Sequence, residues 1–97
     1  MQIEFRTRRL ERNFLDVRRA IQQWGPSVGE RYAERLTMIG AAPSVDALYT
    51  LPALRFHQLA GDRKGQFAAS LTGQWRVIPE LVNDETLRVV SVEDYHG

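Results

Sequence analysis

The spacing of apolar residues changes along the chain, and this change constrains the fold more than any other feature. Between residues 10 and 40, apolar side chains recur every three or four positions, as on one face of a helix. From residue 54 onward they form short runs separated by turn-forming residues, as in strands. A chain of 97 residues has room for one domain, here residues 1–97. We therefore expect a single domain of the α+β class, with helices packed on one face of a sheet.

The first part of the chain predicts one strand and two helices. Residues 1–6 alternate between apolar and polar side chains, which is typical of a short strand. A helix of about Arg8 to Trp24 follows, with Thr7 as its cap and Gly25-Pro26 at its end. A second helix is expected from Val28 to Ile39, because Ser27 and Glu30 have the spacing of a capping box. Two helices joined by so few residues form an antiparallel hairpin.

The second part predicts four strands that follow one another with short turns. The runs are 54–59, 67–71, 75–81 and 87–92, and a single helical turn at 44–48 precedes them. Consecutive strands with short turns pair antiparallel. The expected order is βααββββ, with a two-helix hairpin on one face of a mainly antiparallel sheet.

Composition excludes several kinds of chemistry and location. The chain has no cysteine, so a disulfide, a thiolate metal site and a cysteine nucleophile are all impossible. The two histidines lie too far apart in the sequence for a zinc-binding pattern, and we expect neither a metal nor a cofactor. No apolar run is long enough to span a membrane, and the first ten residues do not resemble a signal peptide. We expect a cytoplasmic protein with no membrane partner.

Three motifs in the second part occur in a recognisable order. They are LRFHQLAGDRKG at residues 54–65, QWRV at 74–77 and EDYH at 93–96. Their order and spacing resemble the HigB-type plasmid-maintenance killer proteins, a branch of the RelE/ParE toxin superfamily. That pattern is roughly a histidine followed by L-K-G-D-x-x-G, a W-R-I strand and a C-terminal D-Y-H. The resemblance extends over nearly the whole chain and includes the helix pair.

The resemblance implies a RelE-like fold and a definite activity. Such proteins are toxins of type II toxin–antitoxin systems. They are ribosome-dependent mRNA endonucleases that enter the ribosomal A site and need no metal. The ribose 2′-OH attacks the adjacent phosphate and leaves a cyclic or 3′ phosphate and a 5′-OH. A cognate helix-turn-helix antitoxin binds and silences the toxin, so contact with DNA is expected only indirectly, through the antitoxin.

This chemistry needs a base, an acid and a cation beside the phosphate. His57 and His96 are the only histidines, both lie in the motifs, and either can be the base or the acid. Arg76 follows Trp75 on a predicted strand, so it faces away from the core if Trp75 packs inward. Its guanidinium can then hold the scissile phosphate. The resemblance implies that Asp94 orients His96, and these four residues are the predicted catalytic set: His57, Arg76, Asp94 and His96.

Further residues are candidates for contact with the RNA substrate. Arg63 and Lys64 occupy a loop between two glycines, and Arg55 lies near it in the sequence. Tyr95 belongs to the C-terminal motif. Of the 13 basic side chains, 12 are arginines, and six of them lie within the first 19 residues: Arg6, Arg8, Arg9, Arg12, Arg18 and Arg19. This basic segment can follow RNA phosphates, pair with an acidic antitoxin segment, or simply be a solvated helix face.

Two departures from the family pattern leave an alternative open. Ala60 stands where the family usually has a lysine, and Thr72 stands where a basic residue is common. The site therefore lacks one or two expected cations. The alternative is a catalytically weak or inactive RelE-like module that binds an antitoxin and takes part in promoter regulation.

Overall fold

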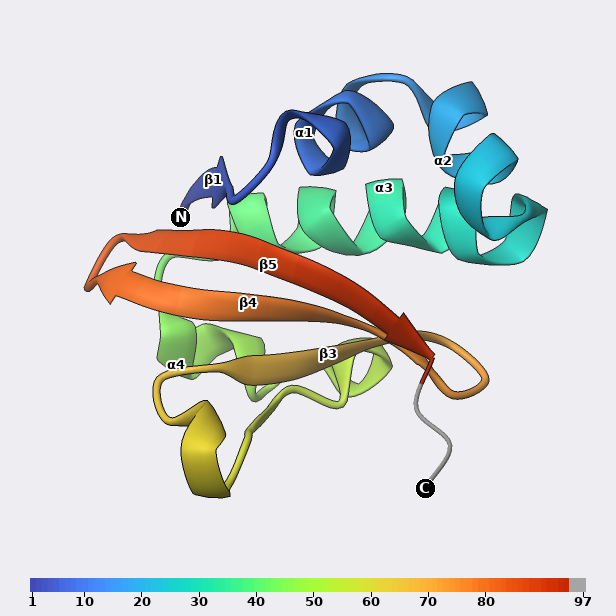
Figure 1. Cartoon of the computed structure of the whole chain (residues 1–97). Coiled ribbons are helices and arrows are strands. Elements are labelled where there is room, and N and C mark those ends of the chain that lie inside the picture. Colours follow the sequence, from blue (N-terminus) through green and yellow to red (C-terminus); the bar gives the residue numbers. More distant parts are fainter. Residues whose placement is uncertain (95–97) are drawn as a thin grey trace.

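The computed structural model describes residues 1–94 and shows two layers, with helices on one side of a five-stranded sheet (Figure 1). Tyr95 and His96 of the predicted site lie outside the described residues. The helices are α1 (Arg8–Leu15), α2 (Val17–Trp24), α3 (Pro26–Ala41), α4 (Val45–Leu48) and the 3₁₀ helices η1 (Pro52–Leu54) and η2 (Gly61–Arg63). The strands are β1 (Gln2–Phe5), β2 (His57–Gln58), β3 (Phe67–Thr72), β4 (Trp75–Asn83) and β5 (Thr86–Asp94).

The sheet has the order β1-β5-β4-β3-β2. Strands β2 to β5 pair antiparallel with their neighbours in sequence, as expected from their short turns. Strand β1 instead pairs parallel with β5, so that Ile3 lies beside Leu87. The α+β class and the mainly antiparallel sheet are therefore confirmed.

The core lies between α3 and the sheet. Tyr32, Leu36 and Ile39 are fully buried on α3 and belong to the same cluster as Val77 and Val89 of the sheet. The Tyr32 hydroxyl donates a 2.7 Å hydrogen bond to the carbonyl of Leu10, and burial raises the pKa of that phenol. Helices α1 and α2 pack on the outer side of α3 (Figure 1). None of the helices within residues 1–94 combines the length and the hydropathy that a membrane-spanning helix needs.

The first predicted helix is in fact two helices, and the prediction of one helix over Arg8 to Trp24 was wrong. Asp16 is extended, with φ −136° and ψ 103°, and interrupts the helix between α1 and α2. Its carboxylate accepts a 3.1 Å hydrogen bond from the backbone nitrogen of Arg18 and so caps α2. A short acidic side chain can compete with the helix for backbone donors in this way. Leu15 and Val17, on either side of this break, are exposed.

The predicted start of the second helix and the predicted strand at 54–59 were also wrong. Helix α3 begins at Pro26 with Gly25 as its N-cap, so Ser27 lies inside the first turn and does not form a capping box. The predicted strand at 54–59 is reduced to His57–Gln58. It is preceded by η1, in which Pro52 occupies the first turn and Arg55 ends the helix with a left-handed φ of 44°. Proline suits a helix start because its φ is already fixed near the helical value.

The contact between α2 and α3 is close enough to require glycine at position 29. Alanine there should lower the free energy of unfolding by about 1–3 kcal/mol, because its Cβ would lie 2.7 Å from the backbone nitrogen of Ile21. Gly40 of the same helix is the matched control, since the nearest atom to its added Cβ is Ile3 Cδ1 at 3.5 Å. Gly40→Ala should be neutral or stabilise by up to about 1 kcal/mol through helix propensity. Chemical denaturation measures both; equal effects would contradict the close-contact explanation.

Candidate active site

One row of polar side chains crosses the face of the sheet that is turned away from α3. Ala69, Val77 and Val92 are paired across β3, β4 and β5, and all three pack in or against the core. Neighbouring residues in a strand point to opposite faces. The next row, Ser70, Arg76 and Glu93, therefore lies on the open face.

Strand β2 brings His57 to the same face. His57 pairs with Ala68, the neighbour of the core residue Ala69, and the side chain of His57 is exposed. A small cavity of about 70 Å³ lies at this place, and its lining residues are Arg55, His57, Ala68, Ser70, Gly73, Trp75 and Arg76. Three predicted site residues, Arg55, His57 and Arg76, thus line one cavity.

The backbone just before β2 sets the proton position on His57. His57 Nδ1 lies 2.9 Å from the carbonyl oxygen of Arg55. A carbonyl only accepts, so this contact favours the form with a proton on Nδ1 and leaves Nε2 as the acceptor in the neutral ring. The left-handed backbone of Arg55 (φ 44°) is the one positive φ among non-glycine residues of the described chain. Such strained conformations often occur at functional sites.

Glu93 holds the loop between β2 and β3 against β5. Both Nη atoms of Arg63 donate to its carboxylate, at 2.9 and 2.7 Å, and Ser91 Oγ donates a further 2.7 Å hydrogen bond. Arg63 Nε donates to Gln66 Oε1 at 3.0 Å. The hydrogen bonds from Arg63, partly offset by burial, hold the pKa of Glu93 below its usual value. Ser91 and the nearby charge of Arg76 act in the same direction on that pKa.

The remaining predicted residues lie around this row. Asp94 is exposed at the end of β5 and is paired with Trp75, so alternation gives Glu93, not Asp94, the position beside Arg76. Lys64 is exposed in the loop next to Arg63. Tyr95 and His96 follow Asp94 outside the described residues.

Sequence reasoning missed Ser70 and Glu93. Strand alternation could have placed Ser70 on the open face, because it lies between the core residues Ala69 and Leu71. The cross-strand neighbours were not predictable, since the register of β3 and β4 shifts between Ser70 and Thr72. Among residues 1–94 no group of three or more acidic or histidine side chains could hold a metal ion.

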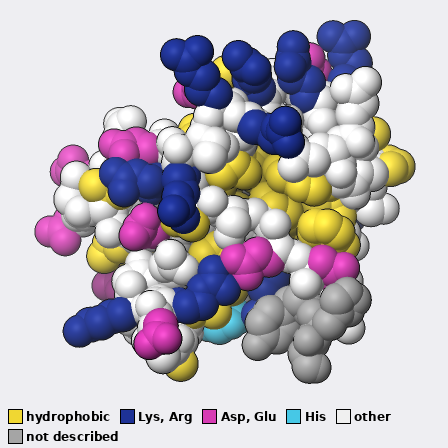
Figure 2. All heavy atoms as spheres, in the orientation of Figure 1, with side chains coloured by type: hydrophobic (Ala, Val, Ile, Leu, Met, Phe, Trp, Pro, Cys, Tyr) yellow, Lys and Arg dark blue, Asp and Glu magenta, His cyan; other side chains and the backbone are white. Residues whose placement is uncertain are grey.

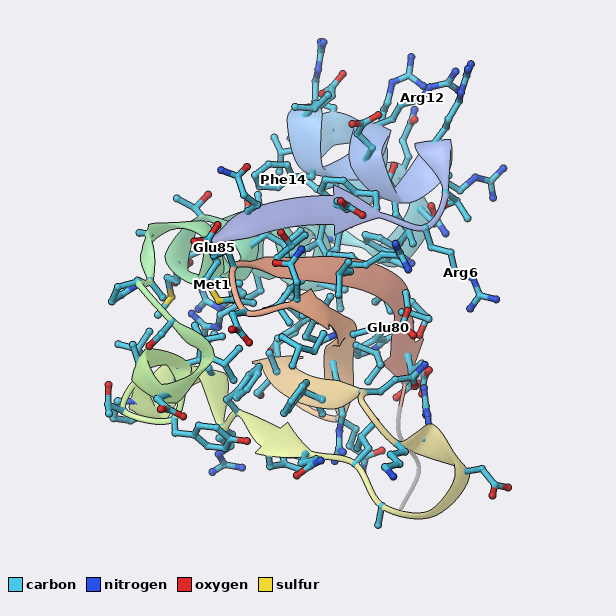
Figure 3. The ribbon with its side chains drawn as sticks, turned by 90° about the vertical axis from the view of Figure 1, so that its left-hand side faces the viewer. Met1, Arg6, Arg12, Phe14, Glu80 and Glu85 are labelled. Atoms are coloured by element: carbon cyan, nitrogen blue, oxygen red, sulfur yellow. The ribbon has the colours of Figure 1, made fainter. Side chains whose placement is uncertain are left out.

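A second polar surface lies far from the sheet, on α1 and α2. Arg9, Arg12 and Arg19 line a cleft of about 380 Å³ together with Asn13, Gln22 and Gln23. Basic side chains, dark blue in Figure 2, gather along the top edge of the molecule, where α1 and α2 lie. Arg12 projects from α1 away from the sheet, and Arg6 projects outward after β1 (Figure 3). Half of the arginine-rich segment therefore lines one positively charged cleft.

The ion pair between Arg63 and Glu93 should make stability depend on pH. Because the folded pKa of Glu93 lies below its ordinary value of 4.5, its stabilising effect is full above that pH and is lost as the pH falls through the folded pKa. Glu93→Gln should cost about 1 kcal/mol or less at neutral pH, since both side chains are about one-third exposed and solvent screens them. Denaturation of wild type and of Glu93→Gln at a series of pH values measures the difference between their free energies of unfolding. A difference that persisted at acidic pH would contradict this assignment.

Comparison with known proteins supports the resemblance seen in the motifs. A family model described as "RelE-like toxin of type II toxin-antitoxin system HigB" matches residues 3–96. No curated protein sequence matches the chain.

Several solved structures have the same fold. YafQ from E. coli strain BL21(DE3) has a TM-score of 0.62 at 16% identity, covering 96% of this chain and 91% of that one. The YoeB–YefM complex from Staphylococcus aureus has a TM-score of 0.59 at 17% identity, and the match covers 100% of this chain and 98% of that one. A YoeB/ParE toxin from Agrobacterium tumefaciens has a TM-score of 0.57 at 13% identity, and the match covers 99% of this chain and 100% of that one. These TM-scores show a common fold, and the family match over almost the entire length means that the chain belongs to the HigB-like, RelE-type toxins of type II toxin–antitoxin systems.

Proposed function

We propose that this toxin is a ribosome-dependent mRNA endonuclease that needs no metal. The observation that carries the proposal is the small cavity on the open face, which Arg55, His57 and Arg76 line together. This arrangement combines a titratable ring with two guanidinium groups, so it can supply the base and the positive charge that cleavage of an RNA phosphodiester uses.

The proposed reaction begins with the ribose 2′-OH. His57 Nε2 takes its proton, and the 2′ oxygen attacks the adjacent phosphorus. Arg76 binds the phosphate oxygens through its planar fork and stabilises the charge of the phosphorane. His96, oriented by Asp94, gives a proton to the departing 5′ oxygen. The products are a 2′,3′-cyclic phosphate and a free 5′-OH.

Substrate contacts complete the proposal. Arg55 lines the cavity and Lys64 is exposed on the neighbouring loop, so both are suited to phosphates of the bound mRNA. Tyr95 is proposed to contact the nucleotide. The arginine-lined cleft on α1 and α2 is proposed to contact rRNA when the toxin enters the A site, with an affinity that falls as salt rises.

The partner expected for a type II toxin is its antitoxin. One structural neighbour is a YoeB–YefM complex, which supports a protein partner for this chain as well. We propose a cognate helix-turn-helix antitoxin, through which the toxin meets DNA only indirectly, and action in the cytoplasm.

A second candidate function is a module that binds its antitoxin but cleaves weakly or not at all. Two observations favour it. Ala60 and Thr72 supply no charge where the family has cations, and the guanidinium of Arg63 is engaged by Glu93. The two candidates differ in whether the chain alone stops growth.

Toxicity is the first test of this proposal. Induced expression of the chain alone in bacteria should arrest growth, because cleaved mRNA cannot be translated, and co-expression of the protein encoded beside it should restore growth. Colony counts and pulse-labelled protein synthesis measure the effect. Normal growth with soluble toxin present at a confirmed level would favour the inactive module.

Single-turnover cleavage on programmed ribosomes tests the site itself. Arg76→Ala should lower the rate by about 10²–10³-fold through the loss of one electrostatic stabiliser. His57→Gln should lower it by about 10²–10⁴-fold, since glutamine cannot exchange the proton.

The two variants should also differ in pH dependence. Arg76→Ala keeps the shape of the pH–rate profile because arginine does not titrate in the accessible range, whereas His57→Gln removes one limb. Arg88→Ala on β5 is the control, since that guanidinium pairs with Glu4 and Glu80 rather than lining the cavity. If both Arg76→Ala and His57→Gln cleaved mRNA at the wild-type rate, the proposal that this cavity is the catalytic site would be refuted.

A further inference from the structure

Glu93 lies where three parts of the open face meet. It belongs to β5, it is paired with Arg76 of β4, and it receives two hydrogen bonds from Arg63 of the loop between β2 and β3. Ser91 Oγ adds a hydrogen bond from the same strand. Glu93 is the first residue of the EDYH motif, but no role was assigned to it there.

The loop that Arg63 anchors contains the 3₁₀ helix η2 and one internal backbone hydrogen bond, from Gln66 N to Arg63 O. It turns at Gly61 and Gly65, which have φ values of 69° and 84°, and Asp62 and Lys64 on it are exposed. Backbone hydrogen bonds close its base, from Leu59 to Gln66 and from Leu81 to Gly65. The fork of Arg63 reaches beyond this base and ties the loop to β5.

The contact with Glu93 also determines whether Arg63 can bind an RNA phosphate. Its two Nη atoms face the two oxygens of a carboxylate, the arrangement that would otherwise hold a phosphate. Exchanging Glu93 for a phosphate would leave a partly buried carboxylate without this partner beside the incoming negative charge. Retaining the pair is therefore favoured over releasing it.

We propose that Glu93 and Arg63 are positioning residues of the proposed nuclease site, and that Arg63 does not bind the substrate phosphate. The pair fastens the loop of residues 61–65 to β5, so that Lys64 on the loop and Arg76 beside Glu93 keep a constant separation. It also holds the end of β5, where Asp94 lies. This inference rests on the proposed function, and it replaces the sequence-based expectation that Arg63 contacts RNA.

Kinetics of four variants separate positioning from phosphate binding. Glu93→Gln, Arg63→Ala and Arg63→Lys should each lower the maximal single-turnover rate by roughly 10- to 100-fold, because small displacements of a site are costly. The half-saturating ribosome concentration should change little. Lysine should not substitute for arginine, since it cannot form the two parallel hydrogen bonds. The Arg63→Ala/Glu93→Gln double variant should be no slower than either single variant, because both remove the same interaction.

The opposite pattern would overturn the proposal. If Arg63 bound phosphate, Arg63→Lys would keep most of the activity and Glu93→Gln would be harmless. Arg63→Ala would then raise the half-saturating concentration and flatten its salt dependence. Arg31→Ala is the control for the loss of an ion pair, because Arg31 pairs with Glu34 on the exposed side of α3.

Hydrogen exchange gives a second readout that does not depend on cleavage. The amides of Leu59, Gln66 and Leu81, which donate the backbone hydrogen bonds that hold the loop, should exchange faster in Glu93→Gln and in each Arg63 variant than in wild type or Arg31→Ala. If wild-type protein does not cleave mRNA while the exchange result holds, the proposed function fails and the fastening of the loop stands. Unchanged exchange in the loop would refute the fastening itself.

Discussion

The register of β4 between β3 and β5 is the constraint on which both the core and the site depend. The pairing that places Val77 between Ala69 and Val92 on the helix side places Arg76 between Ser70 and Glu93 on the other side. A slip of one residue would exchange the two faces. It would bury the guanidinium of Arg76 under α3 and expose Val77, which is now fully buried. Hydrophobic burial on one face therefore determines which polar groups meet on the other.

Much of this architecture was predictable because local patterns report it directly. The strands β3, β4 and β5, the cap at Thr7 and the turn of helix near 45–48 follow from alternation and turn chemistry. The break at Asp16 was not visible, because the apolar spacing continues through it and only the capping geometry interrupts the helix. The parallel partner of β1 was also beyond local patterns, since residue 2 pairs with residue 86.

The site residues also divide into those that the sequence predicted and those that it did not. His57 and Arg76 were found through motifs, and the structure brings both to one cavity. Glu93 is part of the EDYH motif, but that motif gave it no role, and its position beside Arg76 follows from a register that contains a shift at Ser70–Thr72. The interaction of Arg63 could not be inferred from its loop, because its partner lies 30 residues further along the chain. Residues that act by holding others in place are harder to find from sequence than residues that carry the chemistry.

The parallel pair of β1 and β5 has a consequence for how this protein is made. Strand β5 is an inner strand of the sheet, yet it is the last strand of the described chain, and β1 is the first. During translation β1 has no neighbour, and β4 lacks one of its two partners, until β5 has been synthesised. Pairing between such distant segments forms slowly, because the intervening chain must first be ordered. The sheet that presents Arg76 is therefore completed only after β5 has been synthesised, and the polar row across its open face forms no earlier.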